Sequence, residues 1–271
     1  MKKLLLTATA LILAVGALTG CGGRKPCEGN VIKVAASATP HAEILEQLKD
    51  TLAAEGWTLE VTVFDDYVQP NMVVDGGDFD ANYFQHQPYL DDFNVERGTK
   101  LNTVAKIHYE PFGIYPGTSS DLAAIQDGAK IAVPNDTTNE ARALLLLADN
   151  GLITVDENAG LTATVKDITS NPKNLEIIEL EAAQVSRVIN EVDFVVLNGN
   201  YAMEAGLSVG KDAIAAESSE STAAQTYANI LVVKEGNENV EGIQALVKAL
   251  QSDEVKDYIN ATFDGAVVPI F

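Results

Sequence analysis

Strand-like and helix-like segments alternate along the chain from residue 31 onward, and this alternation restricts the fold more than any other feature. Residues 31–36 form a short apolar run typical of a buried strand, and residues 59–64 alternate apolar with polar side chains. Between them, aliphatic residues recur at helical spacing after Pro40, and Gly56 ends the helix. Later strand patterns lie at 130–133, 176–180, 194–197 and 228–234, and helical segments follow each of them. Strands that alternate with helices predict an α/β fold with parallel strand pairs.

The N-terminus has the pattern of an export signal. Lys2 and Lys3 precede an apolar run at 4–18, which ends in Leu18-Thr19-Gly20-Cys21. A cysteine directly after small residues is typical of a lipobox, so residues 1–20 are predicted to be a lipoprotein signal peptide. Cys21 would then carry lipid and anchor the protein to the cell membrane, facing the outside or the periplasm. An ordinary signal peptide with an incidental cysteine is the alternative.

The charge balance of the mature chain excludes some partners. Residues 1–20 hold two lysines and no acids, out of 18 basic and 39 acidic residues in all, so their removal leaves a net charge of −23. Such a surface repels phosphate backbones, which argues against nucleic acid as a partner. It also has no cluster of basic residues that could bind an anionic membrane, so membrane attachment would depend on the lipid. Cys27 then lacks an intramolecular partner, and the polar stretch 21–30 predicts a flexible tether.

The sequence lacks the motifs of common enzymes. It contains no nucleophile elbow, phosphate loop, dinucleotide-binding glycine pattern or zinc-protease motif. The three histidines, His41, His86 and His108, are scattered and lack zinc-ligand spacing, so no metal and no cofactor are predicted. We therefore expect a binding protein and not an enzyme. A secreted hydrolase that uses His86 with a nearby carboxylate would be the enzymatic interpretation, and a structural adhesin would have no small-molecule site at all.

Aromatic side chains gather where predicted strands end, which is where open parallel sheets bind ligands. Segment 80–90 carries three rings and an imidazole in a chain with only 6% aromatic residues, and Tyr67 follows the strand at 59–64. One or two of Tyr83, Phe84 and Tyr89 are expected to pack in the core. His86 and the tyrosine hydroxyls are poor core fillers, so the segment predicts a ligand-facing cluster.

Polar residues at three further strand ends suggest how a charged ligand could be held. Thr137 and Glu140 have capping-box spacing and predict the start of a helix, with Arg142 one turn inside it. An arginine there can form a bidentate pair with a carboxylate, although a surface arginine is the alternative. Asn198 and Asn229 lie at the ends of apolar strands, where an amide can accept from an ammonium and donate to a carboxylate; caps or turns are the alternative.

Over nearly all of residues 21–271, these segments in order resemble the methionine-binding lipoproteins of the NlpA type, the substrate-binding components of methionine ABC importers. The matching segments are 39–45, 84–90, 133–136, 171–175, 180–182, 251–255 and 265–269. The resemblance implies a two-lobed periplasmic-binding-protein type II fold, with the ligand cleft between the lobes. It also implies methionine as ligand and, as partners, an importer permease with its ATPase. At matching positions the ligand-binding residues would be Tyr67, Phe84, His86, Tyr89, Arg142, Asn198 and Asn229. Many relatives carry proline where Thr137 stands and glycine where Ala141 stands.

The chemistry of these residues suits a methionine zwitterion. Arg142 would clamp the carboxylate, Asn198 and Asn229 would accept from the ammonium, and the rings would form a slot for the thioether. Methionine of either configuration is expected, and a methionine-containing dipeptide or another small amino acid is the alternative. Apolar stretches at 112–115 and 228–231 flank a continuous α/β block, so we expect the chain to cross between lobes there. Residues 31–113 with 232–271 would form one lobe, and residues 114–231 the other.

Overall fold

Two separate sheets organise the computed structural model, which describes residues 24–218 and 225–271. The first sheet has six strands in the order β13-β4-β12-β3-β1-β2, and the second has five in the order β11-β5-β10-β6-β9. The first is built from Val268–Pro269 (β13), Leu101–Tyr109 (β4), Asn229–Lys234 (β12), Ala81–His86 (β3), Val31–Ala36 (β1) and Thr58–Val63 (β2). The second is built from Ala215–Ala216 (β11), Gly113–Pro116 (β5), Phe194–Leu197 (β10), Lys130–Pro134 (β6) and Glu176–Leu180 (β9). A small pair, Thr154–Val155 (β7) and Ile168–Ser170 (β8), lies beside the second sheet.

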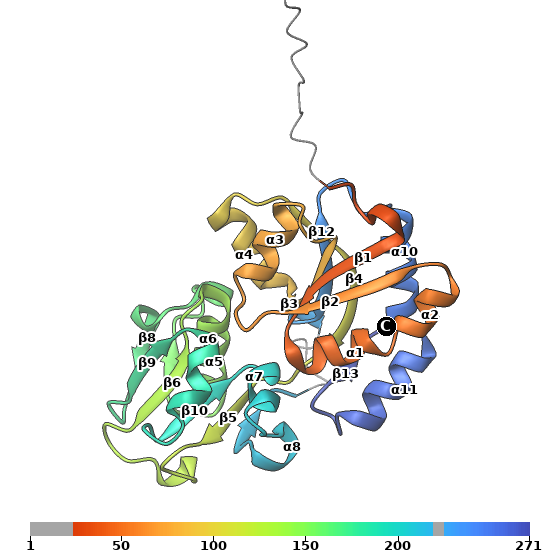
Figure 1. Ribbon diagram of the computed structural model, residues 1–271. Helices are drawn as coiled ribbons and strands as arrows, with labels where there is room; N and C mark the ends of the chain where they lie inside the picture. Colours follow the sequence, from red (N-terminus) through yellow and green to blue (C-terminus); the bar gives the residue numbers. More distant parts are fainter. Residues whose placement is uncertain (1–23, 219–224) are drawn as a thin grey trace, which may run out of the picture.

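Helices cover both faces of the first sheet (Figure 1). Alternate residues of β12 show this: Leu231 and Val233 pack with the core under α10, and Ile230 and Val232 pack toward α3. Parallel pairing of β1 with β2 and with β3 confirms the predicted α/β class. The helices of this lobe are Glu43–Glu46 (α1), Lys49–Ala54 (α2), Gln69–Asp75 (α3), Gln87–Arg97 (α4), Glu241–Leu250 (α10) and Asp253–Thr262 (α11).

The second sheet has its own core and its own helices. Phe112, Ile114, Leu144 and Phe194 are among the buried residues of this core. The helices are Thr137–Asp149 (α5), Ala182–Val185 (α6), Gly199–Glu204 (α7) and Val209–Asp212 (α8). Two sheets with separate cores, joined by two crossings, form the two-lobed binding-protein fold that the resemblance predicted.

The strands place the crossings slightly differently from the sequence expectation. Gly113 already pairs in the second sheet, opposite Leu197. Residues 229–231, which were expected in the second lobe, pair with β3 and β4 of the first sheet. The reason is that the apolar run at 228–231 is the start of a central strand and not a connection. We therefore propose that the first lobe comprises 24–110 with 229–271, and that the second begins near Gly113.

Arg24 and Cys27 attach residues 24–30 to the first lobe, which differs from the expected flexible tether. Both terminal nitrogens of Arg24 donate to the carboxylate of Asp80, each at 2.7 Å, and the backbone N–H of Cys27 donates to it at 2.8 Å. Cys27 is 7% exposed and lies against Trp57 and Gly242, and its burial raises the pKa of the thiol to about 12. A partner about 50 positions away in the sequence fixes the segment, which composition cannot reveal.

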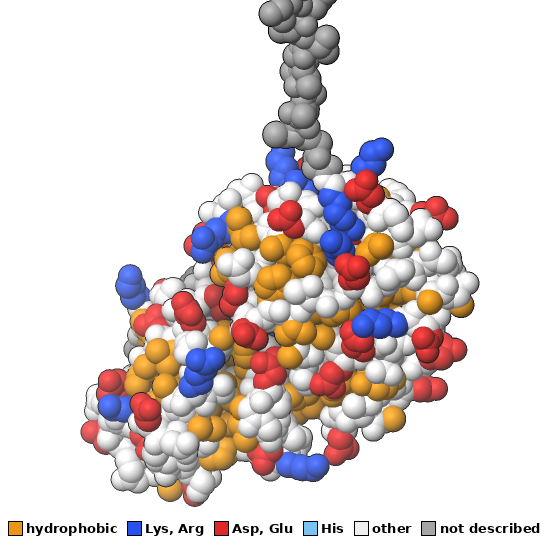
Figure 2. Space-filling view, viewed as in Figure 1, with side chains coloured by type: hydrophobic (Ala, Val, Ile, Leu, Met, Phe, Trp, Pro, Cys, Tyr) orange, Lys and Arg blue, Asp and Glu red, His pale blue; other side chains and the backbone are white. Residues whose placement is uncertain are grey.

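The predicted signal peptide at 1–20, the lipidation site Cys21 and residues 22–23 lie outside the described residues. Within the described ranges, every helix is too short or too polar to cross a bilayer. Acidic side chains are spread over the visible face of both lobes (Figure 2), in keeping with the net charge of −21 for the full sequence.

Candidate ligand-binding site

A cavity between the two lobes contains every residue that the sequence predicted for ligand binding. Its side chains surround a narrow space of about 320 Å³, a volume that includes the part open to solvent. A ligand the size of an amino acid could therefore enter only when the lobes separate. The cavity is lined by Tyr67, Phe84, Gln85, His86, Tyr89, Glu110, Asn139, Arg142, Asn198, Gly199, Asn200 and Asn229. A wider groove, which shares Tyr67 and Tyr89 with the cavity, lies next to it.

Aromatic rings of the first lobe form one wall of the cavity, and Tyr201 of the second lobe packs against Tyr67. The ring of Tyr67 lies 5.7 Å from Phe84, 5.7 Å from Tyr89 and 5.0 Å from Tyr201, measured between centroids. The Tyr67 hydroxyl donates to Asn200 Oδ1 of the second lobe at 2.5 Å. Tyr83 is the ring of segment 80–90 that packs in the core, with its hydroxyl bonded to His108. The wall presents ring faces and edges suited to an apolar, polarisable group.

His86 uses both ring nitrogens inside the protein. Nδ1 accepts from the backbone N–H of Tyr89 at 3.2 Å and so caps α4, and Nε2 donates to Asn139 Oδ1 of the second lobe at 3.0 Å. Burial, with Arg142 nearby, lowers the pKa of His86 to about 4, so the ring is neutral at pH 7. The imidazole therefore joins the lobes and forms part of the wall, and its nitrogens are not free for a ligand.

The hydrogen bonds at the start of α5 leave one amide oxygen, Oδ1 of Asn198, without a hydrogen-bond partner among the described residues. Helix α5 begins at Thr137, but its cap is Asp136, which accepts from the backbone N–H of Asn139 at 3.1 Å; the predicted capping box is wrong. Asn139, which the sequence reasoning missed, accepts from Asn198 Nδ2 at 2.9 Å. Asn198 Oδ1 is buried and has no hydrogen-bond partner among the described residues. Because buried polar atoms are nearly always bonded, this oxygen indicates a ligand donor.

Arg142 is buried, 4% exposed, so it is not the surface residue of the alternative interpretation. Its Nε and Nη2 donate to the two carboxylate oxygens of Glu217 at 2.8 and 2.6 Å, and Nη2 also donates to the backbone oxygen of Glu110 at 3.0 Å. The guanidinium lies 4.1 Å from the centroid of the Tyr227 ring and 4.7 Å from that of Phe112. The predicted bidentate fork is thus made with Glu217, and a ligand carboxylate would have to take Nη1 or displace Glu217.

Glu217 is held in its ionised form by these contacts. Burial by itself would raise the pKa of this carboxyl, but the charge and hydrogen bonds of Arg142 lower it, and Tyr109 Oη and the backbone N–H of Phe112 also donate to it. Since Phe112 and Tyr227 lie in the two crossings between the lobes, Arg142 contacts both crossings as well as the cavity. The sequence reasoning missed Glu217 because it lies 75 positions from Arg142.

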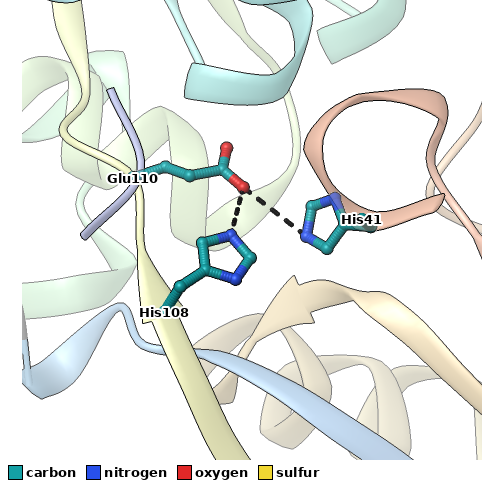
Figure 3. Close-up of side chains that lie close together, drawn as sticks. All are labelled: His41, His108 and Glu110. Atoms are coloured by element: carbon teal, nitrogen blue, oxygen red, sulfur yellow. Dashed lines mark hydrogen bonds and ion pairs between the residues drawn. The ribbon is translucent and has the colours of Figure 1, made fainter. Parts of the chain in front are cut away.

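A second buried carboxylate, Glu110, lies between two histidines (Figure 3). His108 Nε2 lies 2.7 Å from Glu110 Oε1, and His41 Nε2 lies 3.5 Å from the same oxygen. His41 Nε2 also lies 2.9 Å from Asn229 Oδ1, and His108 Nδ1 is bonded to the Tyr83 hydroxyl. One donor atom of each of the three groups lies within 4.8 Å of the others, a set of a kind that can hold a divalent cation. Hydrogen bonds between protein groups account for the arrangement of His41, His108 and Glu110 without a bound cation.

Burial determines the protonation of this cluster. It lowers the pKa of His41 to about 4 and that of His108 to about 3, and it raises the pKa of Glu110, partly against the effects of His41 and the backbone N–H of Asn200. The sequence reasoning missed Glu110. A signal was present, because His108 and Glu110 are separated by two positions and so share one face at the end of a strand.

The family model described as NlpA lipoprotein matches residues 32–271. The chain belongs to the NlpA lipoprotein family. It is 40% identical to the methionine-binding lipoprotein MetQ of Bacillus subtilis, over 100% of this chain and 99% of that protein. It is 42% identical to a probable D-methionine-binding lipoprotein MetQ of Vibrio cholerae, over 99% and 97% of the two chains.

Solved structures of this family share the fold. A lipoprotein of Ruminococcus gnavus is 69% identical with a TM-score of 0.88, over 89% of this chain and 100% of that one. A nutrient-binding protein of Burkholderia cenocepacia, solved bound to methionine, is 44% identical with a TM-score of 0.84 over the same shares. Family members are substrate-binding proteins, so the expected class of binding protein is confirmed.

Proposed function

We propose that this protein is the lipid-anchored substrate-binding component of an ABC importer. It captures methionine between its lobes and delivers it to the membrane permease and its ATPase. The observation that carries the proposal is the cavity between the lobes, which combines a buried guanidinium, an open amide oxygen and aromatic rings. The methionine-bound relative and the names of the MetQ relatives support the choice of ligand. Lipid on Cys21 would hold the protein at the outer or periplasmic face of the cell membrane.

The polar groups of the cavity suit a single amino acid, because one cationic side chain, Arg142, and one open amide oxygen, that of Asn198, lie beside the ring wall. We assign the thioether to the ring wall formed by Tyr67, Phe84 and Tyr89, and the carboxylate to Arg142. A secreted hydrolase finds no support here, because no serine, threonine or cysteine lines the cavity within the described residues and both nitrogens of His86 are bonded.

Calorimetry on protein stripped of ligand tests this function. We expect L-methionine, D-methionine or both to bind more tightly than leucine, by roughly 2- to 12-fold, because contacts of a thioether with aromatic rings contribute about 0.3–1.5 kcal/mol. Mass spectrometry of ligand released from protein purified without stripping should identify the same compound. Preference for a methionine-containing dipeptide would replace the proposed ligand, and no binding of any amino acid by the folded protein would contradict the function.

Gly199 marks a close approach of the lobes and offers a test of closure. A Cβ at this position would lie 2.6 Å from Glu110 Cβ and 2.7 Å from Glu110 Oε2. Glu110 Cβ is fixed to its backbone and cannot move aside, so Gly199→Ala is expected to hold the lobes apart. Overpacking of this kind typically costs about 1–3 kcal/mol, which would weaken methionine binding by roughly 5- to 150-fold. Calorimetry measures the loss, and X-ray scattering should show less compaction with ligand.

Gly210→Ala is the matched control, because a Cβ there meets nothing within 4 Å. Its affinity should equal that of the parent. If Gly199→Ala also binds like the parent, the lobes do not approach this closely in the bound state.

A further inference from the structure

A buried ammonium group requires more acceptors than the predicted asparagines supply. Asn229 Oδ1 lies 2.9 Å from His41 Nε2, so this oxygen is already engaged by a partner inside the protein. Asn198 Oδ1 is open, but one neutral amide oxygen compensates poorly for the lost hydration of a full positive charge. This part of the inference rests on the proposed function, because it assumes a ligand with a free amino group.

The charges that line the cavity leave one carboxylate without an ionic partner. Arg142 is the cationic side chain of the lining, and Glu217 already pairs with it on two hydrogen bonds. Glu110 is the acidic side chain of the lining and is 5% exposed. A bound zwitterion would complement this arrangement, with its carboxylate toward Arg142 and its ammonium toward Glu110.

We propose that Glu110 recognises the positively charged amino group of the ligand, and that His41 and His108 position its carboxylate. Ionised Glu110 can only accept, so His108 Nε2 carries the ring proton and donates it to Oε1, and His108 Nδ1 accepts from the Tyr83 hydroxyl. His41 Nε2 approaches the same oxygen from another part of the first lobe (Figure 3). His108 therefore donates to Oε1, and His41 Nε2, which is hydrogen-bonded to Asn229, lies 3.5 Å from the same oxygen.

The other carboxylate oxygen faces the second lobe. The missing Cβ of Gly199 would lie 2.7 Å from Oε2, and the backbone N–H of Asn200 donates to the carboxylate. A single carboxylate thus contacts the first lobe, the second lobe and the ligand space. Recognition of the amino group and closure of the lobes are consequently joined at Glu110.

The proposal predicts how binding depends on pH. His41 and His108 face Glu110 from the first lobe, and Arg142 and Glu204 face it from the second. Burial raises the pKa of Glu110 in the free protein, and a bound ammonium would lower it again. Binding should therefore release a proton between these two pKa values, and affinity should rise with pH through that window and level off above it. The histidines, with pKa values of about 4 and 3, are neutral at pH 7.

The experiment compares methionine with 4-(methylsulfanyl)butanoate, which lacks only the amino group, by calorimetry on the full chain. The parent should prefer methionine by roughly 30-fold or more, the loss typical of one removed partner of a buried charge pair. Glu110→Gln should remove most of this preference by weakening methionine binding, while the affinity for the analogue stays within a few-fold of the parent. His108→Gln should weaken methionine binding less and shift the midpoint of its pH profile, which a purely structural role would not do.

Glu140→Gln is the matched control, because Glu140 is also buried but bonds the backbone N–H of Val165 outside the cavity. Its preference for methionine should equal that of the parent. If Glu110→Gln does not fold, calorimetry of the parent in buffers of different ionisation enthalpy measures the proton release directly. If methionine binding releases no proton within the pH range where affinity rises, the proposal is overturned.

The outcomes separate this inference from the proposed function. A parent that binds methionine while Glu110→Gln keeps the full preference would overturn the role of Glu110 and leave the function intact. A parent that binds neither compound would contradict the function itself. Methionine affinity that disappears in EDTA and returns with Zn²⁺ would assign His41, His108 and Glu110 to a metal, and would also overturn the proposal.

Discussion

Arg142→Ala will abolish methionine binding in the micromolar range. Removing one partner of a buried charge pair typically costs about 2–5 kcal/mol, or roughly 30- to 4,000-fold in affinity. The guanidinium is the cationic group of the cavity lining, and the start of α5 supplies only partial charge in its place. Arg142→Lys keeps the charge and loses the planar geometry, so its affinity for methionine should lie between that of the parent and that of Arg142→Ala. Calorimetry on folded variants measures the difference.

The same substitution affects stability, and the two effects must be separated. Arg142→Ala leaves Glu217 buried and unpaired, which typically costs about 3–5 kcal/mol of folding free energy. The double variant Arg142→Ala with Glu217→Gln removes that unpaired charge. It should regain much of the stability, measured by urea unfolding, without regaining affinity. If Arg142→Ala binds methionine within a few-fold of the parent, the carboxylate is held elsewhere.

Acidification will destabilise the protein through its three buried histidines. His41, His86 and His108 have pKa values of about 4, 4 and 3 in the folded chain, against an ordinary value of 6.5. As the pH falls below 6.5, these histidines bind protons in the unfolded chain but not in the folded chain. The free energy of unfolding therefore decreases until the pH reaches the folded-state pKa of each ring. At pH 5 each histidine should lower the free energy of unfolding by about 2 kcal/mol relative to pH 7.5. Carboxyls with raised pKa values, Glu110 and Asp136 among them, oppose this loss.

Comparison with a variant isolates the contribution of one ring. His86→Asn should be less stable than the parent at pH 7.5, because it loses the bond to Asn139. Between pH 7.5 and pH 5, however, its unfolding free energy should fall by about 2 kcal/mol less than that of the parent. Urea unfolding at the two pH values measures both changes. Equal losses in the two proteins would show that His86 is protonated in the folded state at pH 5.

Much of the fold was predictable where a strand is rich in aliphatic residues. The strands expected at 31–36, 176–180 and 194–197 coincide with β1, β9 and β10. β4, at Leu101–Tyr109, was not predicted, because polar and charged residues interrupt its pattern and its place depends on pairing with β12. Sequence periodicity reports local burial, whereas such pairing is set by contacts far along the chain.

The residues that line the candidate site were predictable, but the hydrogen bonds and ion pairs between them were not. The predicted residues lie around one cavity because most of them lie near strand ends, and these ends meet between the lobes. Glu217, Asn139 and Gly199 were missed, because their roles arise only when distant segments touch. The bidentate partner of Arg142 is the plainest example, since the arginine alone predicts a carboxylate but not which one.

The docking of Arg24 on Asp80 has a mechanical consequence at the membrane. If lipid is attached at Cys21, only residues 22 and 23 separate it from a side chain that is fixed to the first lobe. Three fully extended residues span about 11 Å at most. The first lobe would then sit at the lipid surface as a stationary base, and the second lobe would be the part that swings when a ligand is captured or released.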